Sequence, residues 1–277
     1  GKIHTTFQQM VTATGRISST DPNLQNIPIR TELGGEVRRM FVPSDDEHCF
    51  IDADYSQIEL RILAHMADDR VMQHAFASDM DIHTATAAQV FRVPPEDVDA
   101  NMRRAAKAVN FGIVYGISEF SLAEDIGVSR YEAKAYIDNY LANYHGVRTY
   151  MKDVVAKARE SGFTQTLYGR KRYIPELTSS NFNIRQGAER IALNTPIQGT
   201  AADLIKLAMI RVYDALEQNY PDAKLLLQVH DELIVECPEE LASQVAELIS
   251  KEMEQVAALH VPLVAEAKWG SSWYDAK

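Results

Sequence analysis

Two carboxylates, far apart in the chain, each stand at the end of an apolar stretch that is typical of a β-strand. Asp54 follows the run CFIDA, and Asp231 follows LLLQVH. If the two strands are neighbours in one sheet, the carboxylates lie close enough to repel each other unless cations separate them. Two Mg²⁺ ions roughly 3.5–4 Å apart neutralise such a pair and clamp the attacking and leaving oxygens of a phosphoryl displacement. The pattern predicts metal-dependent phosphoryl transfer, with Asp52, on the same strand face as Asp54, as an alternative ligand.

The residue types around these acids favour magnesium over zinc. Carboxylate oxygens are hard ligands, which suit Mg²⁺, and we expect two such ions as cofactors. The two cysteines, Cys49 and Cys237, stand alone in the sequence and indicate neither a zinc site nor a disulfide framework. Two other readings stay open: the HDE segment is a solvated hairpin turn, or His230 and Asp231 are the ligand pair of a metal phosphohydrolase. Such pairs normally lie on helices, whereas the flanks here are strand-like.

A helix-like stretch between the two acids carries cations and aromatic residues at a spacing of four. Its members are Arg103, Lys107, Phe111 and Tyr115. Steps of four residues advance about 40° around an α-helix, so the four side chains occupy one continuous face of about 120°. Cations at the first two positions can hold a triphosphate, and the aromatic rings can pack on a sugar and a base. The alternative is that the cations are surface residues and the rings belong to the core.

The elements that position these residues follow from the periodicity of the chain. Apolar strands are expected at 48–53 and on both sides of the HDE turn, whereas the middle of the chain has the period of helices. Helices are expected from 58 onward and at 81–91, 102–115, 129–144, 147–161, 199–219 and 238–259, with a hairpin at 163–175 and an extended or looping start over the first 44 residues. Strands at both ends with helices between them indicate an α+β fold, in which an antiparallel sheet carries an inserted helical subdomain.

Composition and charge limit the class of protein. The chain has 277 residues, 46% of them apolar, which suits one large domain or two moderate ones. Its net charge of −11 argues on average against a nucleic-acid partner, but residues 101–118 hold three cations and no acid, and YGRKRY at 168–173 is a second basic stretch. Because charges more than about 8 Å apart are largely screened at physiological salt, a basic groove can exist on an acidic protein. Without a long apolar run or a secretory leader, we expect a cytoplasmic protein with no membrane partner.

Five segments resemble one family of proteins. They are DYSQIELR at 54–61, RRAAKAVNFGIVYG at 103–116, QVHDE at 228–232, TATGRISSTDPNLQNIP at 12–28 and NTPIQGTAADLIK at 194–206. The first three resemble motifs A, B and C of the family A DNA polymerases, the family that includes bacterial DNA polymerase I, and the similarity runs from the first residue to the last. The resemblance implies a fragment of a right-hand polymerase, with a palm at 1–66 and 194–277 and fingers at 67–193, and without the thumb and exonuclease-type domain that precede this region in the family.

The resemblance also implies a reaction and its catalytic residues. The reaction is the addition of a dNTP to the 3′-hydroxyl of a primer, directed by a template strand and assisted by two Mg²⁺ ions. Asp54 and Asp231 would hold the metals together with the backbone carbonyl of Tyr55, and Glu232 would act nearby in a secondary role. With Lys107, the three acids form the implied catalytic set.

A further group of residues is implied to bind the nucleotide. Its members are Glu59, His83, Arg103, Lys107, Phe111 and Tyr115. The three basic residues would bind the triphosphate, and Phe111 would pack on the deoxyribose. A phenylalanine here, rather than the tyrosine of some relatives, implies discrimination against dideoxynucleotides. Glu59 and Tyr115 would occupy the place of a 2′-hydroxyl and so select deoxyribonucleotides.

The implied DNA-binding residues are Arg16, Arg190, Asn194, Gln198, Gln228 and His230. A copying enzyme must bind every sequence, so it should contact the minor-groove acceptors that all base pairs share. Asn194 and Gln198 could equally cap or bridge helices. The implied partners are primer-template DNA and a dNTP, and the chain is expected to act as a monomer.

Two other functions compete with DNA synthesis. A non-catalytic DNA-binding remnant is the main alternative, because the expected fragment lacks the thumb that grips the duplex. A single-subunit RNA polymerase shares the palm and the metal chemistry, but Glu59 and Tyr115 together disfavour ribonucleotides.

Overall fold

The computed structural model describes residues 1–28, 32–78 and 80–277, and contacts between residues divide the chain into two compact units. The first unit comprises Gly1–Ile58, Ala201–Ala258 and Leu263–Lys277, and the second comprises Glu59–Thr200 and Leu259–Pro262. Each unit therefore joins segments that are distant in the sequence. These borders differ from the predicted ones at 66/67 and 193/194, and the assignment of the two units as palm and fingers stays a prediction.

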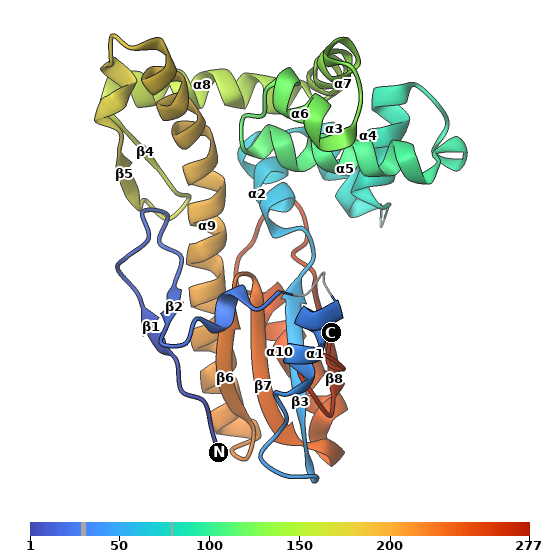
Figure 1. The fold of residues 1–277 in the computed structure, drawn as a ribbon, viewed down its shortest axis with the longest axis vertical. Coiled ribbons are helices and arrows are strands. Elements are labelled where there is room, and N and C mark those ends of the chain that lie inside the picture. Colours follow the sequence, from blue (N-terminus) through green and yellow to red (C-terminus); the bar gives the residue numbers. More distant parts are fainter. Residues whose placement is uncertain (29–31, 79) are drawn as a thin grey trace. The chain divides into compact units, whose positions relative to one another are not determined.

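A four-stranded antiparallel sheet, in the order β6-β7-β3-β8, forms the centre of the first unit (Figure 1). Its strands are β3 (His48–Tyr55), β6 (Lys224–Val229), β7 (Glu232–Pro238) and β8 (Ala265–Gly270). Because successive side chains of a strand point to opposite faces, Phe50, Asp52 and Asp54 share one face of β3 and the residues between them share the other. On that other face, the Tyr55 hydroxyl donates a hydrogen bond to the Met253 carbonyl of α10 (Ala242–Glu254) at 2.6 Å. The face that carries the acids is therefore the one turned away from this helix.

An apolar cluster on the acid-bearing face supports the sheet. Its buried members are Phe50, Val229, Ile234, Trp273 and Ala276, and Ile27, Phe41 and Leu227 pack against them. The other elements of this unit are β1 (Thr6–Gln8), β2 (Ser18–Thr20), the 3₁₀ helices η1 (Leu24–Asn26) and η4 (Glu239–Leu241), and α1 (Glu32–Arg39). The strands β1 and β2 pair with each other in a separate two-stranded sheet.

The second unit is mostly helical. Its elements are α2 (Ile58–Met66), α3 (Arg70–Ala77), α4 (Ile82–Phe91), η2 (Pro95–Asp97), α5 (Ala100–Val114), α6 (Glu119–Ile126), α7 (Arg130–Asn143), α8 (His145–Ser161), the hairpin of β4 (Phe163–Gln165) and β5 (Lys171–Tyr173), and η3 (Pro175–Thr178). Side chains of Asp or Ser cap the first turns of α3 to α7, which explains why these helices begin where they do. Of the helices within the described ranges, none is both long and apolar enough to cross a membrane.

The predicted α+β class and antiparallel sheet are confirmed, but two predicted helices have wrong borders. The helix expected at 199–219 is α9 (Phe182–Asn219), which continues through Pro196. A proline inside a helix removes one hydrogen bond and normally marks a border, and here burial along α9 outweighs that cost. The helix expected at 238–259 is shorter, because η4 precedes α10 and α10 ends at Glu254. The start of the chain, expected to be extended or looping, also contains α1.

Asp69 joins two helices of the second unit at their N-termini. One carboxylate oxygen accepts a hydrogen bond from the Met72 amide of α3 at 3.0 Å, and the other accepts from the Gly146 and Val147 amides of α8 at 2.8 and 3.3 Å. The carboxylate is buried, with 3% of the residue exposed. The N-cap of α8, Tyr144, makes no side-chain cap bond of its own, so Asp69 supplies the cap from a distance.

Replacing Asp69 by alanine should therefore destabilise the protein strongly. We expect a loss of about 2–4 kcal/mol in the free energy of unfolding, since two helix caps disappear and buried amides lose their acceptor. Urea unfolding followed by circular dichroism measures the loss. Asp69→Asn is the matched control, because it keeps one side-chain acceptor and should cost less; equal losses would show that the caps are not the cause.

Candidate active site

The sheet brings the predicted catalytic acids together. In the register of β3 and β7, Asp54 lies opposite Glu232, and on its other side it lies opposite Glu266 of β8. The Tyr55 amide donates a hydrogen bond to the Asp231 carbonyl oxygen at 3.3 Å. Asp231 is thus next to the residue that pairs with Asp54, and the two side chains are close enough for the charge of Asp231 to raise the pKa of Asp54. The convergence of the two acids, expected from strand ends alone, follows from this pairing.

A tight turn presents Asp231 beside the strand end. Strands β6 and β7 are joined by His230 and Asp231, and His230 has a φ of 54°, in the left-handed region. Two-residue hairpins prefer positive φ at their central positions, and histidine tolerates it better than most residues. The hairpin turn therefore also positions the Asp231 carboxylate.

Burial makes the charges of this group unfavourable. Burial raises the pKa of Asp54 to about 7, and the charge of Asp231 adds to the effect. Burial also raises the pKa of Asp52 to about 6, although Lys277 and Arg38 oppose the rise. The pKa of Asp231 is raised by burial as well. Within the described ranges, one oxygen of Asp54 and both oxygens of Asp52 lack a hydrogen-bond donor. The negative charges of Asp52, Asp54 and Asp231 are therefore only partly compensated, and a bound cation would stabilise them.

The donor set fits a divalent ion that is shared with a substrate. Among the residues that the structure describes, no three His, Cys, Asp or Glu side chains are arranged to enclose a metal ion. Magnesium does not require such a cage, because it is usually held by one or two carboxylates, waters and substrate phosphates. Asp54, Asp231 and the carbonyl of Tyr55 match that pattern.

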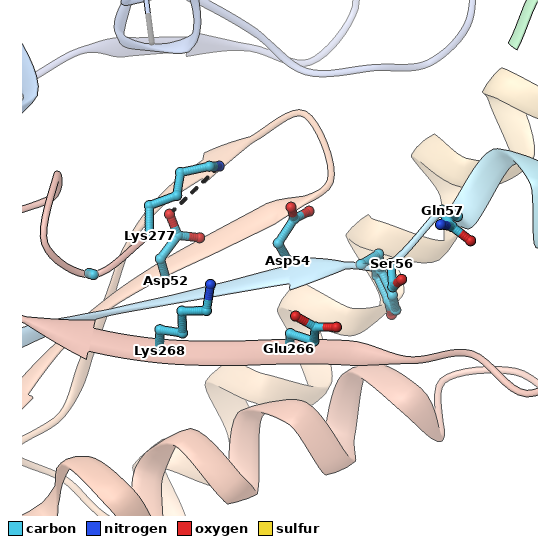
Figure 2. A pocket seen from close by; sticks show the side chains of 9 residues that line it. Asp52, Asp54, Ser56, Gln57, Glu266, Lys268 and Lys277 are labelled. Atoms are coloured by element: carbon cyan, nitrogen blue, oxygen red, sulfur yellow. Dashed lines mark ion pairs between the residues drawn. The ribbon is translucent and has the colours of Figure 1, made fainter. Parts of the chain in front are cut away.

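A pocket opens beside the acids on β3 and β8. Its volume is about 290 Å³, and its lining residues are Asp52, Asp54, Tyr55, Ser56, Gln57, Glu266, Lys268, Ala276 and Lys277. Figure 2 shows Asp52 and Asp54 projecting from the same side of β3, with the Lys277 side chain reaching toward Asp52. The pocket is lined by charges of both signs, namely the acids Asp52, Asp54 and Glu266 and the lysines Lys268 and Lys277.

The raised pKa of Asp54 predicts a pH-dependent stability that metal should remove. The ordinary pKa is 3.8 and the folded value is about 7, so the folded state binds this proton more tightly than the unfolded state does. The resulting stabilisation is complete below about pH 4 and is lost as pH rises through 7. In the presence of EDTA we expect a loss of roughly 1–2 kcal/mol between pH 5 and 8, after allowing for solvent screening of a partly exposed group. Thermal unfolding at several pH values measures it.

Two comparisons test the origin of that pH dependence. Millimolar Mg²⁺ should raise the melting temperature more at pH 8 than at pH 5, because the ion binds the ionised carboxylates. Asp54→Asn should make the pH profile in EDTA shallower, since the amide does not titrate, while Asp52 and Asp231 still contribute. A variant profile parallel to that of the wild type would assign the effect to other groups.

The predicted triphosphate-binding residues lie on or beside α5 in the second unit. Arg103 donates to both oxygens of Asp81 at 2.8 and 3.0 Å, and Asp81 also caps α4. Lys107, one turn further along α5, is exposed, and Phe111 is half-buried. The face predicted from the spacing of four therefore presents cations to solvent, with Arg103 held in place by Asp81. Its last member, Tyr115, is the C-cap of the helix rather than part of it.

His83 is buried behind this face and is uncharged at neutral pH. Burial lowers its pKa to about 4. Its Nδ1 lies 3.1 Å from the Asn110 amide nitrogen, and its ring centroid lies 5.8 Å from that of Phe111. Because an amide nitrogen can only donate, Nδ1 is the acceptor and the proton resides on Nε2. His83 can thus donate a hydrogen bond to a phosphate but brings no charge to it.

Glu59 and Tyr115 form the pair that the resemblance implies. The Tyr115 hydroxyl donates to Glu59 at 3.0 Å, and 8% of Glu59 is exposed against 40% of Tyr115. Both lie in the second unit, in the same unit as Arg103 and Phe111. The buried carboxylate fixes the orientation of an exposed phenol ring.

The predicted DNA-binding residues fall into two sets. In the first unit, the Gln25 amide donates to the side-chain and backbone oxygens of Gln228 at 3.2 and 3.0 Å, while Gln228 donates to the His230 carbonyl at 2.5 Å. Burial and the charge of Arg16 lower the pKa of His230, so Arg16 lies near this set. The other three, Arg190, Asn194 and Gln198, follow one face of α9 at a spacing of four within the second unit.

Several residues of the site had no signal in the sequence analysis. Asp81 accepts two hydrogen bonds from Arg103, but the sequence predicted it only as the first residue of a helix. Lys277 contacts Glu232 directly and lies 3.9 Å from Asp52. Gln25 lies in one of the resembling segments but showed no role there. Each of these contacts joins residues whose separation along the chain hides them from pattern analysis.

Comparison with known proteins identifies the class of this fold. The chain superposes on a solved structure described as the POL domain of Pol1 from M. smegmatis in complex with DNA primer-template and dNTP, with a TM-score of 0.95 and 46% sequence identity, covering 100% of this chain and 49% of that one. The fold is thus that of a polymerase domain, and the α+β prediction is confirmed at this finer level.

The sequence comparisons establish the family. A model of DNA polymerase family A matches residues 1–275. The chain is 56% identical to DNA polymerase I of Bacillus subtilis over 276 residues and 54% identical to that of Pseudomonas aeruginosa over 276 residues, covering 100% of this chain in both cases. The chain belongs to DNA polymerase family A. It spans about a third of the length of these relatives, 31% and 30% respectively.

Proposed function

We propose that this chain is the catalytic part of a template-directed DNA polymerase, which adds dNTPs to a primer 3′-hydroxyl. The observation that carries the proposal is the meeting of Asp54 and Asp231 at neighbouring strand ends, buried and short of positive charge. The M. smegmatis structure described with primer-template and dNTP supports the same substrates for this chain. In this proposal the sheet unit is the palm and the helical unit is the fingers.

In this proposal the metal ligands belong to the first unit and the triphosphate-binding residues to the second. Asp54 and Asp231, with the Tyr55 carbonyl, would hold two Mg²⁺ ions, which when bound stabilise the charge that develops as pyrophosphate leaves the α-phosphate. Lys107 and Arg103 would bind the triphosphate through charge-assisted hydrogen bonds. Asp81 holds the Arg103 guanidinium in a fixed orientation, so a phosphate must share or displace that carboxylate.

The remaining residues would position the primer end and the template. Gln228 and His230 lie next to Asp231, so hydrogen bonds from this turn to the minor groove would hold the terminal base pair beside the acids. Arg190, Asn194 and Gln198 would contact the nucleic acid from α9. We also propose that the chain acts as a monomer in the cytoplasm.

Primer extension tests the proposal. A labelled primer on a template is incubated with dNTPs and Mg²⁺, once with the chain alone and once with a longer version that includes the segment preceding it in its relatives. We expect extension by the longer version and its complete loss with excess EDTA, because the carboxylates are themselves negative and only bound cations would neutralise the transferred phosphate. DNA binding without extension in either version, with any of Mg²⁺, Mn²⁺ or Co²⁺, would instead support a non-catalytic remnant.

A further inference from the structure

Lys277 lies among the acids of the first unit. Its ammonium nitrogen contacts Glu232 directly and lies 3.9 Å from Asp52. Both partners are buried, with side-chain exposures of 10% for Glu232 and 2% for Asp52, while Lys277 itself is 30% exposed. Figure 2 shows the lysine side chain bending over Asp52, beside Asp54. A single cation is thus shared between two carboxylates that flank the proposed metal ligands.

The position of Lys277 is set by the core of the unit. The preceding Ala276 is fully buried, and Trp273 is 1% exposed, both within the apolar cluster of the sheet. The Trp273 amide donates to the Phe41 carbonyl at 3.0 Å, and the Ala276 amide donates to the Ser272 carbonyl at 3.1 Å. The segment that carries Lys277 is therefore anchored, and its ammonium group is delivered to one place.

Lys277 compensates part of the negative charge of Asp52. Its other cationic neighbour, Arg38, is 5% exposed and stacks over the Trp273 ring, with its Cζ 4.4 Å from the ring centroid. Both oxygens of Asp52 and one oxygen of Glu232 lack a hydrogen-bond donor within the described part of the chain. Two buried carboxylates with free oxygens would attract a divalent ion if the ammonium group were absent, because Arg38 alone offsets only part of their negative charge.

We propose that Lys277 is a positioning residue, whose ammonium group occupies Asp52 and Glu232 and so leaves Asp54 and Asp231 as the acids that bind divalent ions. This inference rests on the proposed function in one respect, namely that Asp54 and Asp231 are metal ligands. The lysine acts as a tethered cation at the edge of the site. It excludes a surplus ion by charge repulsion and holds Glu232 in a fixed orientation.

Counting bound Mn²⁺ by electron paramagnetic resonance, without DNA or nucleotide, tests the role of Lys277. We expect Lys277→Met to bind one more Mn²⁺ per chain than the wild type and to bind its ions about tenfold more tightly, because a repelling charge is gone and a carboxylate pair is free. The double variant Lys277→Met/Asp52→Asn should return to the wild-type count, because it lacks both the ammonium and one acid of the pair. Lys277→Arg should keep the wild-type count.

The direction of the change separates positioning from a structural role. Damage to the fold would weaken Mn²⁺ binding, so an unchanged or reduced count in a folded Lys277→Met would overturn the inference. If that variant does not fold, as judged by thermal unfolding in EDTA, Lys277→Gln carries the same expectation, because its amide still donates to Glu232 without bringing charge.

This readout is independent of DNA synthesis. An extra ion in Lys277→Met together with no primer extension by the longer version of the wild-type chain would refute the proposed function but keep the role of the lysine. Extension by the wild type with no extra ion in the variants would refute only the role of the lysine.

Discussion

Asp231→Asn lowers the rate of primer extension by about 10³-fold or more, and Asp54→Asn does the same. Each change removes a carboxylate charge from the proposed site, where two cations would stabilise the transferred phosphate. Metal ions contribute several kcal/mol of such stabilisation, and each 1.36 kcal/mol corresponds to a factor of ten in rate. Asparagine keeps the size and one oxygen of aspartate, so the loss reports on charge. Single-turnover nucleotide addition by the longer version of the chain measures the rate.

Asp222→Asn is the matched control for charge removal outside the site. Asp222 is exposed in the segment that precedes β6 and has no assigned role. We expect its rate to stay within about twofold of the wild type, as exposed substitutions away from structural features are usually nearly neutral. The DNA affinity of the two catalytic variants should remain similar to that of the wild type or increase, because acids near a polyanion are removed. Normal rates in Asp231→Asn would refute the assignment of this residue.

Glu59→Ala raises the incorporation of ribonucleotides relative to deoxyribonucleotides by roughly 10–100-fold. The buried carboxylate holds the Tyr115 hydroxyl at 3.0 Å, and together they would fill the space that a 2′-hydroxyl needs. Removing a steric and polar barrier of this kind is worth about 1–3 kcal/mol in discrimination. The ratio of kcat/KM for rNTP and dNTP incorporation measures the effect, again with the longer version of the chain.

Tyr115→Phe separates the two members of this pair. It removes the hydroxyl that donates a hydrogen bond to Glu59 but keeps the ring. A steric barrier to the 2′-hydroxyl that is made by the ring and the carboxylate should therefore remain largely intact. We expect the same ratio to change by about tenfold at most, since one partly exposed hydrogen bond is worth about 0.5–1.5 kcal/mol. If Glu59→Ala left the ratio unchanged while dNTP incorporation remained normal, the selection of deoxyribonucleotides would lie elsewhere.

Local patterns were sufficient for many elements of the fold. Strand β3 and the hairpin of β6 and β7 could be predicted because apolar runs and turn residues act over a few neighbours. The start of the helix expected at 129–144 has a local cause as well, because Ser129 and Glu132 form a capping box at the start of α7. The start of α9 at Phe182 could not be predicted in this way, because Pro196 opposes a helix locally and only contacts with other elements compensate for it.

Local patterns predict the main residues of the candidate site but not the contacts between them. The types and spacing of Asp54, Asp231, Arg103 and Lys107 indicate phosphoryl transfer from the sequence alone. Acids at strand ends, together with cations and aromatic rings on one helix face, suit few other reactions. The network of Asp52, Glu232, Arg38 and Lys277 carried no such signal. Its members come from distant parts of the chain and meet only through sheet pairing and the packing of Trp273.

The sequence by itself determined the chemistry of this protein: which groups are acids, which are cations, and where most of the strands and helices lie. The tertiary structure decided how those groups affect one another. Pairing of β3 with β7 sets Asp54 beside Glu232 and near Asp231, and burial then raises the pKa of Asp54 to about 7. Charge interactions depend on distance and on exclusion of water, and both quantities exist only once the chain has folded.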